Sequence, residues 1–117
     1  LGVTVFSRIE EAVQWADVLN VLRLQLERME AGFLPSLREY NQVWGVSQAR
    51  LDQAPKDLLI LHPGPMNRGV EIDSEVADMI DRSIITRQVE MGVAIRMAAL
   101  DVLTRRARGV TGWGDAA

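Results

Sequence analysis

The sequence predicts an α/β fold, a parallel sheet with flanking helices that ends in a long C-terminal helix. Two observations carry this prediction. Short apolar runs of strand length alternate with segments that have helix caps and helical spacing, as in parallel sheets joined by crossover helices. Residues 83–106 then continue with apolar residues at helical spacing and without a proline.

The first expected unit is a strand, a helix and a second strand. Residues 2–6 are rich in residue types that favour strands. Ser7 and Glu10 have the spacing of a capping box, which predicts a helix from there to Trp15. The mostly apolar run 18–22 predicts a strand buried on both faces, so the three elements form a βαβ unit.

The middle of the chain predicts a second crossover of the same kind. Ser36 and Glu39 form another capping box, for a helix that Gly45 stops. Residues 47–54 predict a short helix, and the apolar run 58–61 predicts the strand that follows it.

Two more helices complete the predicted fold. Asp73 caps a short one that extends through Met79 and Ile80. Residues 83–106 form the long helix, about 36 Å at ~1.5 Å per residue, and residues 109–117 are expected to be a frayed tail. The methionines that we expect to pack in the core are Met79, Met91 and Met97.

This organisation divides the chain into residues 1–82, which hold the sheet, and residues 83–117, which hold the long helix and the tail. The helix is apolar on more faces than the first part can cover, so it needs another surface. The chain also opens at Leu1 with a strand-like segment and no leader. We therefore expect it to be cut on its N-terminal side and to lack a further domain.

The composition excludes several classes of function. A net charge of −3 argues against a nucleic-acid partner. The chain has no cysteine and one histidine, so we expect neither a metal site nor a cofactor bound through thiolates. No apolar run approaches the ~18 residues that a membrane span needs, and no signal peptide is recognisable. The expected protein is cytoplasmic.

The run 62–70, His-Pro-Gly-Pro-Met-Asn-Arg-Gly-Val, directly follows the predicted strand 58–61, and α/β folds bind ligands at such strand ends. Pro63 and Pro65 stiffen this loop and have no N–H, while Gly64 lets a ligand approach the main chain. The loop thus predicts a rigid set of carbonyl acceptors for a small molecule with N–H groups. A structural proline-rich turn is the alternative.

Arg23 and Gln25 leave the sheet at the end of the predicted strand 18–22, where a binding crevice is expected. The planar guanidinium of Arg23 could bind a carboxylate of a ligand. The alternative, from the spacing alone, is an exposed arginine at a strand end without a ligand. His62 is expected to be structural, because no acid or nucleophile is paired with it by spacing.

Three motifs stand in register along the chain: Leu22-Arg23-Leu24-Gln25-Leu26-Glu27-Arg28, His62-Pro63-Gly64-Pro65 and Gly92-Val93-Ala94-Ile95-Arg96-Met97. In order and spacing they resemble the C-terminal half of aspartate carbamoyltransferase, over about residues 1 to 106. Ornithine-specific relatives typically carry a cysteine where Pro63 stands, so the aspartate branch is the closer match.

The resemblance implies that residues 1–82 belong to the aspartate-binding domain and that the long helix returns to a carbamoyl-phosphate domain. It implies transfer of a carbamoyl group from carbamoyl phosphate to L-aspartate, which yields N-carbamoyl-L-aspartate and phosphate in de novo pyrimidine biosynthesis. A homotrimer is the implied assembly, with dihydroorotase or regulatory chains in some family members.

The resemblance also implies roles for single residues. Arg23 matches an arginine that binds a substrate carboxylate of L-aspartate, and Gln25 a glutamine that assists there. Gly64 and Pro65 match loop residues whose carbonyls contact carbamoyl phosphate. Pro63 and Arg96 are further candidates, Arg96 near the entrance of the site. Glu27 and Arg28 fall where the family has a mobile loop.

The chain departs from the family in what it lacks. The Ser-Thr-Arg-Thr phosphate-binding motif, a further arginine and histidine, and the lysine loop of a neighbouring subunit have no match here. The chain is therefore expected to supply half of an active site and to be inactive alone. The alternative is a transcarbamoylase-like scaffold without activity. A doubly wound nucleotide binder has no support, because no Gly-x-Gly-x-x-Gly run occurs.

Overall fold

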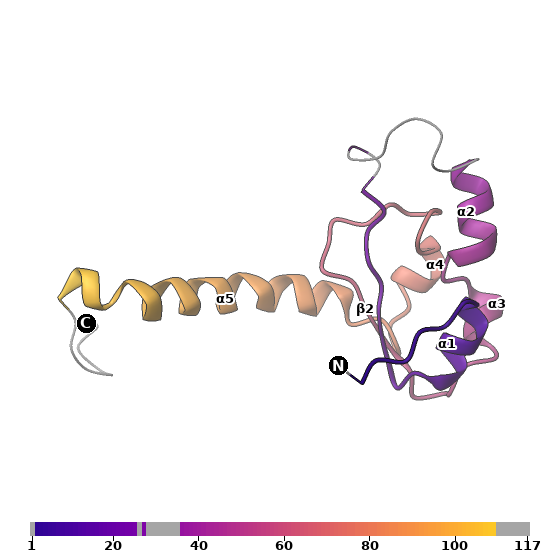
Figure 1. Cartoon of the computed structure of the whole chain (residues 1–117), viewed down its shortest axis with the longest axis horizontal. Coiled ribbons are helices and arrows are strands. Elements are labelled where there is room, and N and C mark those ends of the chain that lie inside the picture. The colour runs from indigo at the N-terminus through magenta and orange to yellow at the C-terminus, as the bar shows by residue number, and fades with distance from the viewer. Residues whose placement is uncertain (1, 26, 28–35, 110–117) are drawn as a thin grey trace.

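A body with a small parallel sheet carries one long helix that projects from it (Figure 1). The computed structural model describes residues 2–25, 27 and 36–109. The helices in this part are α1 (Ile9–Trp15), α2 (Leu37–Trp44), α3 (Gln48–Leu51), α4 (Ser74–Ala77) and α5 (Ile85–Thr104), and the 3₁₀ helix η2 (Arg106–Arg108) follows α5. Leu26, Arg28 and the expected tail from residue 110 lie outside the described residues.

The sheet pairs β1 (Val18–Asn20) with β2 (Leu59–Leu61) in parallel, with Leu19 opposite Ile60. The chain passes from one strand to the other through α2 and α3, which confirms the predicted crossover and the α/β class. On the other side of β2, the Ile60 N–H donates to the Arg82 carbonyl over 2.9 Å. Main-chain contacts on both sides therefore hold β2 in the middle of the body.

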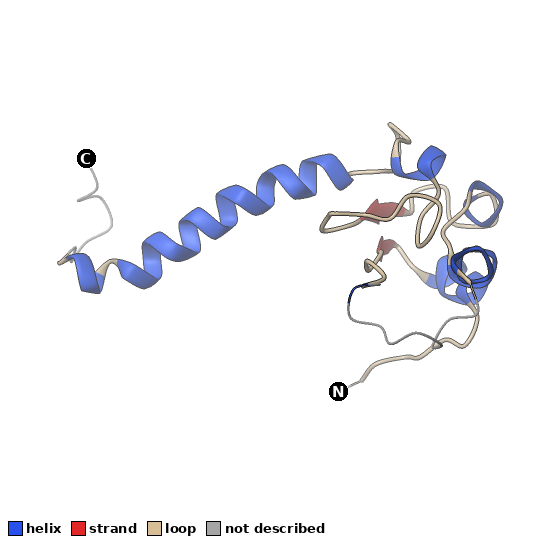
Figure 2. Ribbon diagram, turned by 90° about the horizontal axis from the view of Figure 1, so that it is seen from above, coloured by secondary structure: helices blue, strands red, loops and turns tan. Residues whose placement is uncertain are grey.

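The core lies around β2. Figure 2 shows the short helices of the body beside the two strands, on the side away from α5. Leu58, Ile60 and Ile72 are fully buried there, together with Leu51 from α3 and Val76 from α4. The other buried apolar residues are Val13, Ala16, Val21, Val46, Val70, Ala77 and Ile85. The short helices α1, α3 and α4 are stable here because each contributes one or two buried side chains to this cluster, whereas α2 contributes none.

The capping signals had different outcomes. Ser36 Oγ accepts the Glu39 N–H over 3.0 Å, as the second capping box predicts. Gly45 ends α2, and a Cβ there would clash with the side chain and carbonyl of Asn41. The box at Ser7 is wrong: α1 has Arg8 at its N-cap and no side-chain hydrogen bond at that cap.

The carboxylate of Glu10 explains the missing capping box. Its Oε1 accepts from Arg50 Nε over 3.0 Å, so a contact from α3 engages the group that the box needs. A tertiary ion pair has replaced the local cap.

The strand expected at residues 2–6 is also wrong. This segment forms no strand and pairs with no described strand, and Val5 is 87% exposed. Strand propensity yields a strand only where a neighbour offers its main chain, so the sheet in the described part has two strands and the first βαβ unit does not form. The short helix expected after Asp73 begins there without a side-chain cap hydrogen bond and ends at Ala77, short of the predicted Met79 and Ile80, and Ile80 is fully exposed.

The long helix is confirmed, and the body leaves most of its apolar surface uncovered, as expected. Of its residues only Ile85 is buried, because α5 runs away from the body after its first turns (Figure 1). Met79 packs against the core as predicted, whereas Met91 and Met97 are exposed on α5 and the core prediction is wrong for both. No described helix is long and apolar enough to cross a membrane.

Candidate functional site

The two strand ends that carry the candidate residues lie side by side. β1 and β2 are parallel, and beyond them the Val21 N–H still donates to the Leu61 carbonyl over 2.8 Å. The segment with Arg23 and the loop that begins at His62 therefore leave the sheet at the same edge. This is the neighbourhood that the sequence predicts for them.

A side-chain contact joins these two segments. Asn67 Nδ2 donates to the Leu24 carbonyl over 2.9 Å. Leu24 lies between Arg23 and Gln25, and Asn67 is three residues beyond Gly64 in the loop. The hydrogen bond thus fixes the distance between the loop and the strand extension.

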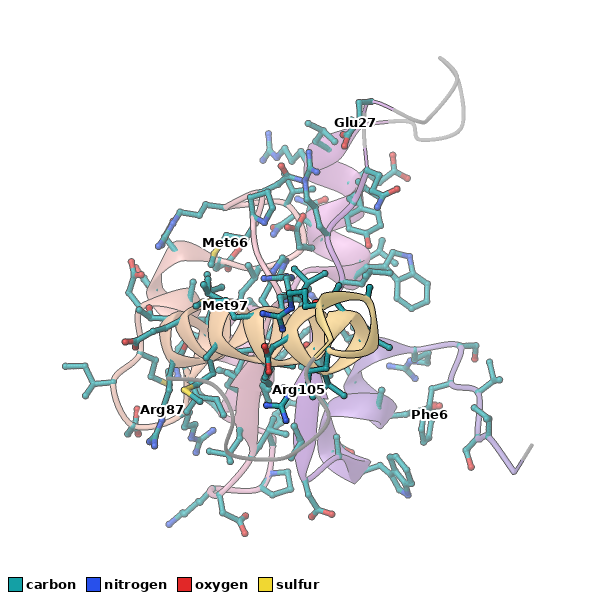
Figure 3. All side chains as sticks on the ribbon, turned by 90° about the vertical axis from the view of Figure 1, so that its left-hand side faces the viewer. Phe6, Glu27, Met66, Arg87, Met97 and Arg105 are labelled. Atoms are coloured by element: carbon teal, nitrogen blue, oxygen red, sulfur yellow. The ribbon has the colours of Figure 1, made fainter. Side chains whose placement is uncertain are left out.

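Arg23 is half-buried and paired with Glu27, whereas Gln25 is exposed. Seen along α5, Glu27 lies at the upper end of the body and Arg87, near the start of α5, on its lower side (Figure 3). Arg28, which the resemblance groups with Glu27, lies outside the described residues.

The loop backbone at Gly64 requires glycine. Its φ is +64°, in the left-handed region, and a Cβ there would lie 3.2 Å from Val89 of α5. The Gly64 N–H donates to His62 Nδ1 over 2.9 Å, and the Gly64–Pro65 peptide is cis. Pro63 and Pro65 are exposed. The two prolines therefore leave the loop without main-chain donors at these positions.

His62 is fully buried and structural, as expected, and its partner is Glu71. The distance between His62 Nε2 and Glu71 Oε1 is 3.3 Å, and the same oxygen accepts the Asn67 N–H over 2.6 Å. Tyr40 lies near this carboxylate: burial, and secondly the negative charge of Glu71, raise the pKa of Tyr40.

Glu71 and Gln88 also contact His62, and neither is predicted as a site residue from the sequence. Gln88, on α5, accepts the His62 N–H over 2.8 Å. The signal for Glu71 is a single acid between the apolar residues Val70 and Ile72, and all three are buried. Such a pattern marks a buried acid but does not identify its partner. Gln88 gives no signal, since an isolated glutamine on a helix is ordinary.

Two hollows flank Pro63 between the loop and the first turns of α5. One, of about 450 Å³, includes Pro63, Gln88 and Arg96 among its lining residues. The other, of about 550 Å³, is lined by Pro63, Gly64, Pro65, Met66, Ile85, Thr86 and Val89. Arg23 and Gln25 line neither of these hollows. The structure thus brings the loop candidates together with α5 and keeps Arg23 at the strand edge.

The residue types at the edge where the Arg23 segment and the loop leave the sheet limit what this site can bind. Within the described ranges, no three or more His, Asp or Glu side chains form a group that could hold a metal ion. What the edge offers is a guanidinium, an amide and main-chain carbonyls, which bind and orient polar small molecules.

Comparison with known proteins gives consistent matches. The profile of the family "Aspartate/ornithine carbamoyltransferase, Asp/Orn binding domain" matches residues 2–103. The chain is 60% identical over 116 residues to the aspartate carbamoyltransferase catalytic subunit of Erythrobacter litoralis, which covers 98% of this chain and 33% of that protein. The corresponding subunit of Gemmatimonas aurantiaca is 68% identical over 103 residues, covering 88% and 32%. The chain thus spans about a third of the length of the curated relatives it matches.

Solved structures agree in fold. Aspartate transcarbamoylase from Trypanosoma cruzi, in complex with carbamoyl aspartate and phosphate, is 33% identical with a TM-score of 0.62, over 78% of this chain and 27% of that one. Ornithine carbamoyltransferase from Burkholderia thailandensis has a TM-score of 0.64 at 21% identity, over 84% and 29%, and shows the fold alone.

Proposed function

This chain belongs to the aspartate/ornithine carbamoyltransferase family, and on that premise we propose that it is the L-aspartate-binding segment of an aspartate carbamoyltransferase. The reaction is transfer of a carbamoyl group from carbamoyl phosphate to L-aspartate in de novo pyrimidine biosynthesis. The amine nitrogen of aspartate attacks the carbonyl carbon, the bond from that carbon to the phosphate oxygen breaks, and the departing phosphate takes up the proton that the nitrogen loses.

One observation carries the proposal for this chain's own residues. The segment with Arg23 and the loop with Gly64 leave the sheet at one edge, and the hydrogen bond from Asn67 to Leu24 joins them. A reaction between two small molecules needs two binding segments at such close quarters.

The proposed roles follow from chemistry. Arg23 binds a carboxylate of aspartate and Gln25 assists there, since a guanidinium offers N–H groups in the plane that a carboxylate needs. The carbonyls of Gly64 and Pro65 accept from the amide of carbamoyl phosphate. Pro63 and Arg96 are additional candidates through the hollow that they share. Catalysis by these groups consists of orientation and binding, without a covalent intermediate.

The proposal also covers the parts of the chain. Residues 1–82 form part of the aspartate-binding domain, and residues 83–117 return to a carbamoyl-phosphate domain of a longer protein. That domain supplies the groups that bind phosphate. In the family that this chain resembles they belong to a Ser-Thr-Arg-Thr motif, which this chain does not contain. The longer protein is a cytoplasmic homotrimer.

The test uses a chimeric subunit, the catalytic subunit of Erythrobacter litoralis in which this chain replaces the matching segment. We expect the chimeric subunit to form carbamoyl aspartate from carbamoyl phosphate and L-aspartate, with L-ornithine as the control substrate that gives no product. A folded, assembled chimeric subunit that forms no product would overturn the proposal and favour the inactive scaffold. Product from ornithine alone would overturn the choice of substrate.

A further inference from the structure

We propose that Glu71 is a positioning residue for the loop 62–67, acting directly on Asn67 and through His62 on Gly64. The inference deepens the proposed function and rests on it only for the kinetic consequence. Neither Glu71 nor His62 touches a substrate in this proposal. Their task is to hold the main chain whose carbonyls at Gly64 and Pro65 bind carbamoyl phosphate.

The hydrogen bonds of His62 define its tautomer. Nδ1 accepts the Gly64 N–H over 2.9 Å, so this nitrogen carries no proton. The proton of the neutral ring is then on Nε2, which lies 3.3 Å from Glu71 Oε1 and donates to it. Glu71 thereby selects the tautomer that can accept from Gly64, the residue held at a φ of +64°.

Glu71 Oε1 also has a second main-chain contact. It accepts the Asn67 N–H over 2.6 Å, so one carboxylate oxygen holds the loop at Asn67 and, through the imidazole, at Gly64. The side chains of His62 and Glu71 are 0% and 2% exposed, so water does not compete for these contacts.

The second oxygen of Glu71 supports the assignment. Glu71 Oε2 is buried and, in the described part of the chain, has no hydrogen-bond partner. A buried oxygen without a partner is unfavourable for the fold. An apolar side chain would avoid that cost, so the benefit of a carboxylate at this position lies in the contacts of Oε1.

The same network reaches both substrate segments. Asn67, whose N–H is held by Glu71, donates from its side chain to the Leu24 carbonyl over 2.9 Å. On the other side, Gln88 of α5 accepts the His62 N–H over 2.8 Å. The loop is therefore fixed to the strand extension of Arg23 and to the start of α5 as well as to its own interior. Loss of Glu71 releases the loop from its interior contact, while the Gln88 contact remains.

The experiment compares Glu71→Ala with Glu71→Gln in the chimeric subunit, and uses Val76→Ala as the matched control. Val76 is also fully buried, and its side chain is not in this hydrogen-bond network. We expect Glu71→Ala to raise the KM for carbamoyl phosphate about ten- to a hundredfold, as displaced supporting groups do. Glu71→Gln retains an acceptor oxygen and restores most of this loss. The KM of Val76→Ala stays within about twofold of the parent value, because the small cavity left at α4 removes no contact of the loop.

A second readout does not depend on activity. Hydrogen exchange followed by mass spectrometry should show faster exchange of the peptide over residues 62–70 in Glu71→Ala, with wild-type protection in Glu71→Gln and Val76→Ala. An unchanged peptide in Glu71→Ala would overturn the positioning role. If the chimeric subunit has no transfer activity, the proposed function fails, and hydrogen exchange still decides the role of Glu71.

Variants at His62 cover the case in which Glu71→Ala does not fold. His62→Asn places an amide near the former Nδ1 and can still accept from Gly64, whereas His62→Gln places its amide near the former Nε2. We expect the lower KM for carbamoyl phosphate in His62→Asn. Equal KM values for the two variants would contradict the proposed route from Glu71 to Gly64.

Discussion

Arg23 and Glu27 form a two-point ion pair, with NH1 3.0 Å from Oε1 and NH2 3.1 Å from Oε2. The side chains are 32% and 53% exposed, so water reaches the pair. A guanidinium has five N–H groups and this contact engages two of them. Glu27 therefore orients Arg23 and leaves N–H groups for the carboxylate of a substrate.

Replacement of Arg23 by alanine in the chimeric subunit should raise the KM for aspartate strongly. Loss of an arginine–carboxylate contact to a bound substrate costs on the order of 2–4 kcal/mol. The KM for carbamoyl phosphate should change little. Arg8→Ala is the control, because Arg8 is another arginine beside a glutamate but lies at the start of α1. Equal losses for both substrates would show that Arg23 holds the fold instead.

Glu27→Gln tests the orientation of Arg23. The glutamine amide offers one acceptor oxygen in place of two, so Arg23 loses one of its two hydrogen bonds to residue 27. We expect a higher KM for aspartate than in the parent, by less than in Arg23→Ala. Steady-state kinetics with varied aspartate measures this. A KM below that of the parent would show that Glu27 competes with the substrate for Arg23.

Arg50→Ala should destabilise the fold without acting on the site. Arg50 is 14% exposed, and its guanidinium donates to the carbonyls of Gly45 and Gln42 over 2.6 and 2.8 Å and pairs with Glu10. Removal leaves carbonyls at the end of α2 without donors, at a cost of about 2–4 kcal/mol. Urea unfolding of the chimeric subunit measures the loss. Glu10→Gln keeps the contacts of Arg50 with the carbonyls, so it should lower the free energy of unfolding clearly less. An equal loss would show that the ion pair with Glu10 alone causes the effect.

The pair of Arg68 and Asp78 gives a pH dependence with a defined sign. Both guanidinium NH groups lie 2.7 Å from the carboxylate, and this hydrogen bonding holds the pKa of Asp78 below its ordinary value of 3.8. Because the folded state has the lower pKa, the contribution is fully present above about pH 4 and is lost as pH falls through the folded-state pKa.

The measurement is the difference in Tm between the parent chimeric subunit and Asp78→Asn. We expect a small difference, since the pair is exposed, that is constant from about pH 7 to 5 and shrinks below about pH 4. Asp81→Asn, an exposed aspartate in the same region, is the control. A difference that grows as the pH falls would contradict the assignment.

Much of the fold was predictable because it depends on local patterns. The strand segments β1 and β2, the cap at Ser36 and the long helix all follow from residues close in sequence, and the alternation of strands with helices predicts the parallel crossover. Contacts between distant residues were not predictable in this way. Arg50 reaches Glu10 across 40 positions and replaces the cap expected at Ser7.

The candidate site was likewise predictable only in part. The spacing of strand ends predicts that Arg23 and the loop share an edge, since parallel strands end on one side. The buried partners behind the loop were missed, because Glu71 and Gln88 are identified only by what they contact in space. The roles of Arg23, Gln25, Gly64 and Pro65 stay predictions, which the variants above test in part.

The exposed apolar surface of α5 gives the last prediction. Its exposed large apolar residues are Val89, Met91, Val93, Ile95, Met97, Leu100, Val102 and Leu103. Their spacing covers several faces of the helix, more than the body can bury (Figure 1). The 117-residue chain alone should therefore bind an apolar dye or associate, and should form no carbamoyl aspartate.

Addition of the remaining N-terminal part of the Erythrobacter litoralis subunit, as a separate protein, should suppress dye binding and give turnover. The double variant Leu100→Glu, Leu103→Glu keeps good helix formers on α5 but places charge on its apolar surface, so it should abolish this complementation. Val5→Glu is the matched control, because Val5 is also exposed to water but lies outside α5. A monodisperse monomer that carbamoylates aspartate unaided would contradict both the division of the chain and the need for a second domain.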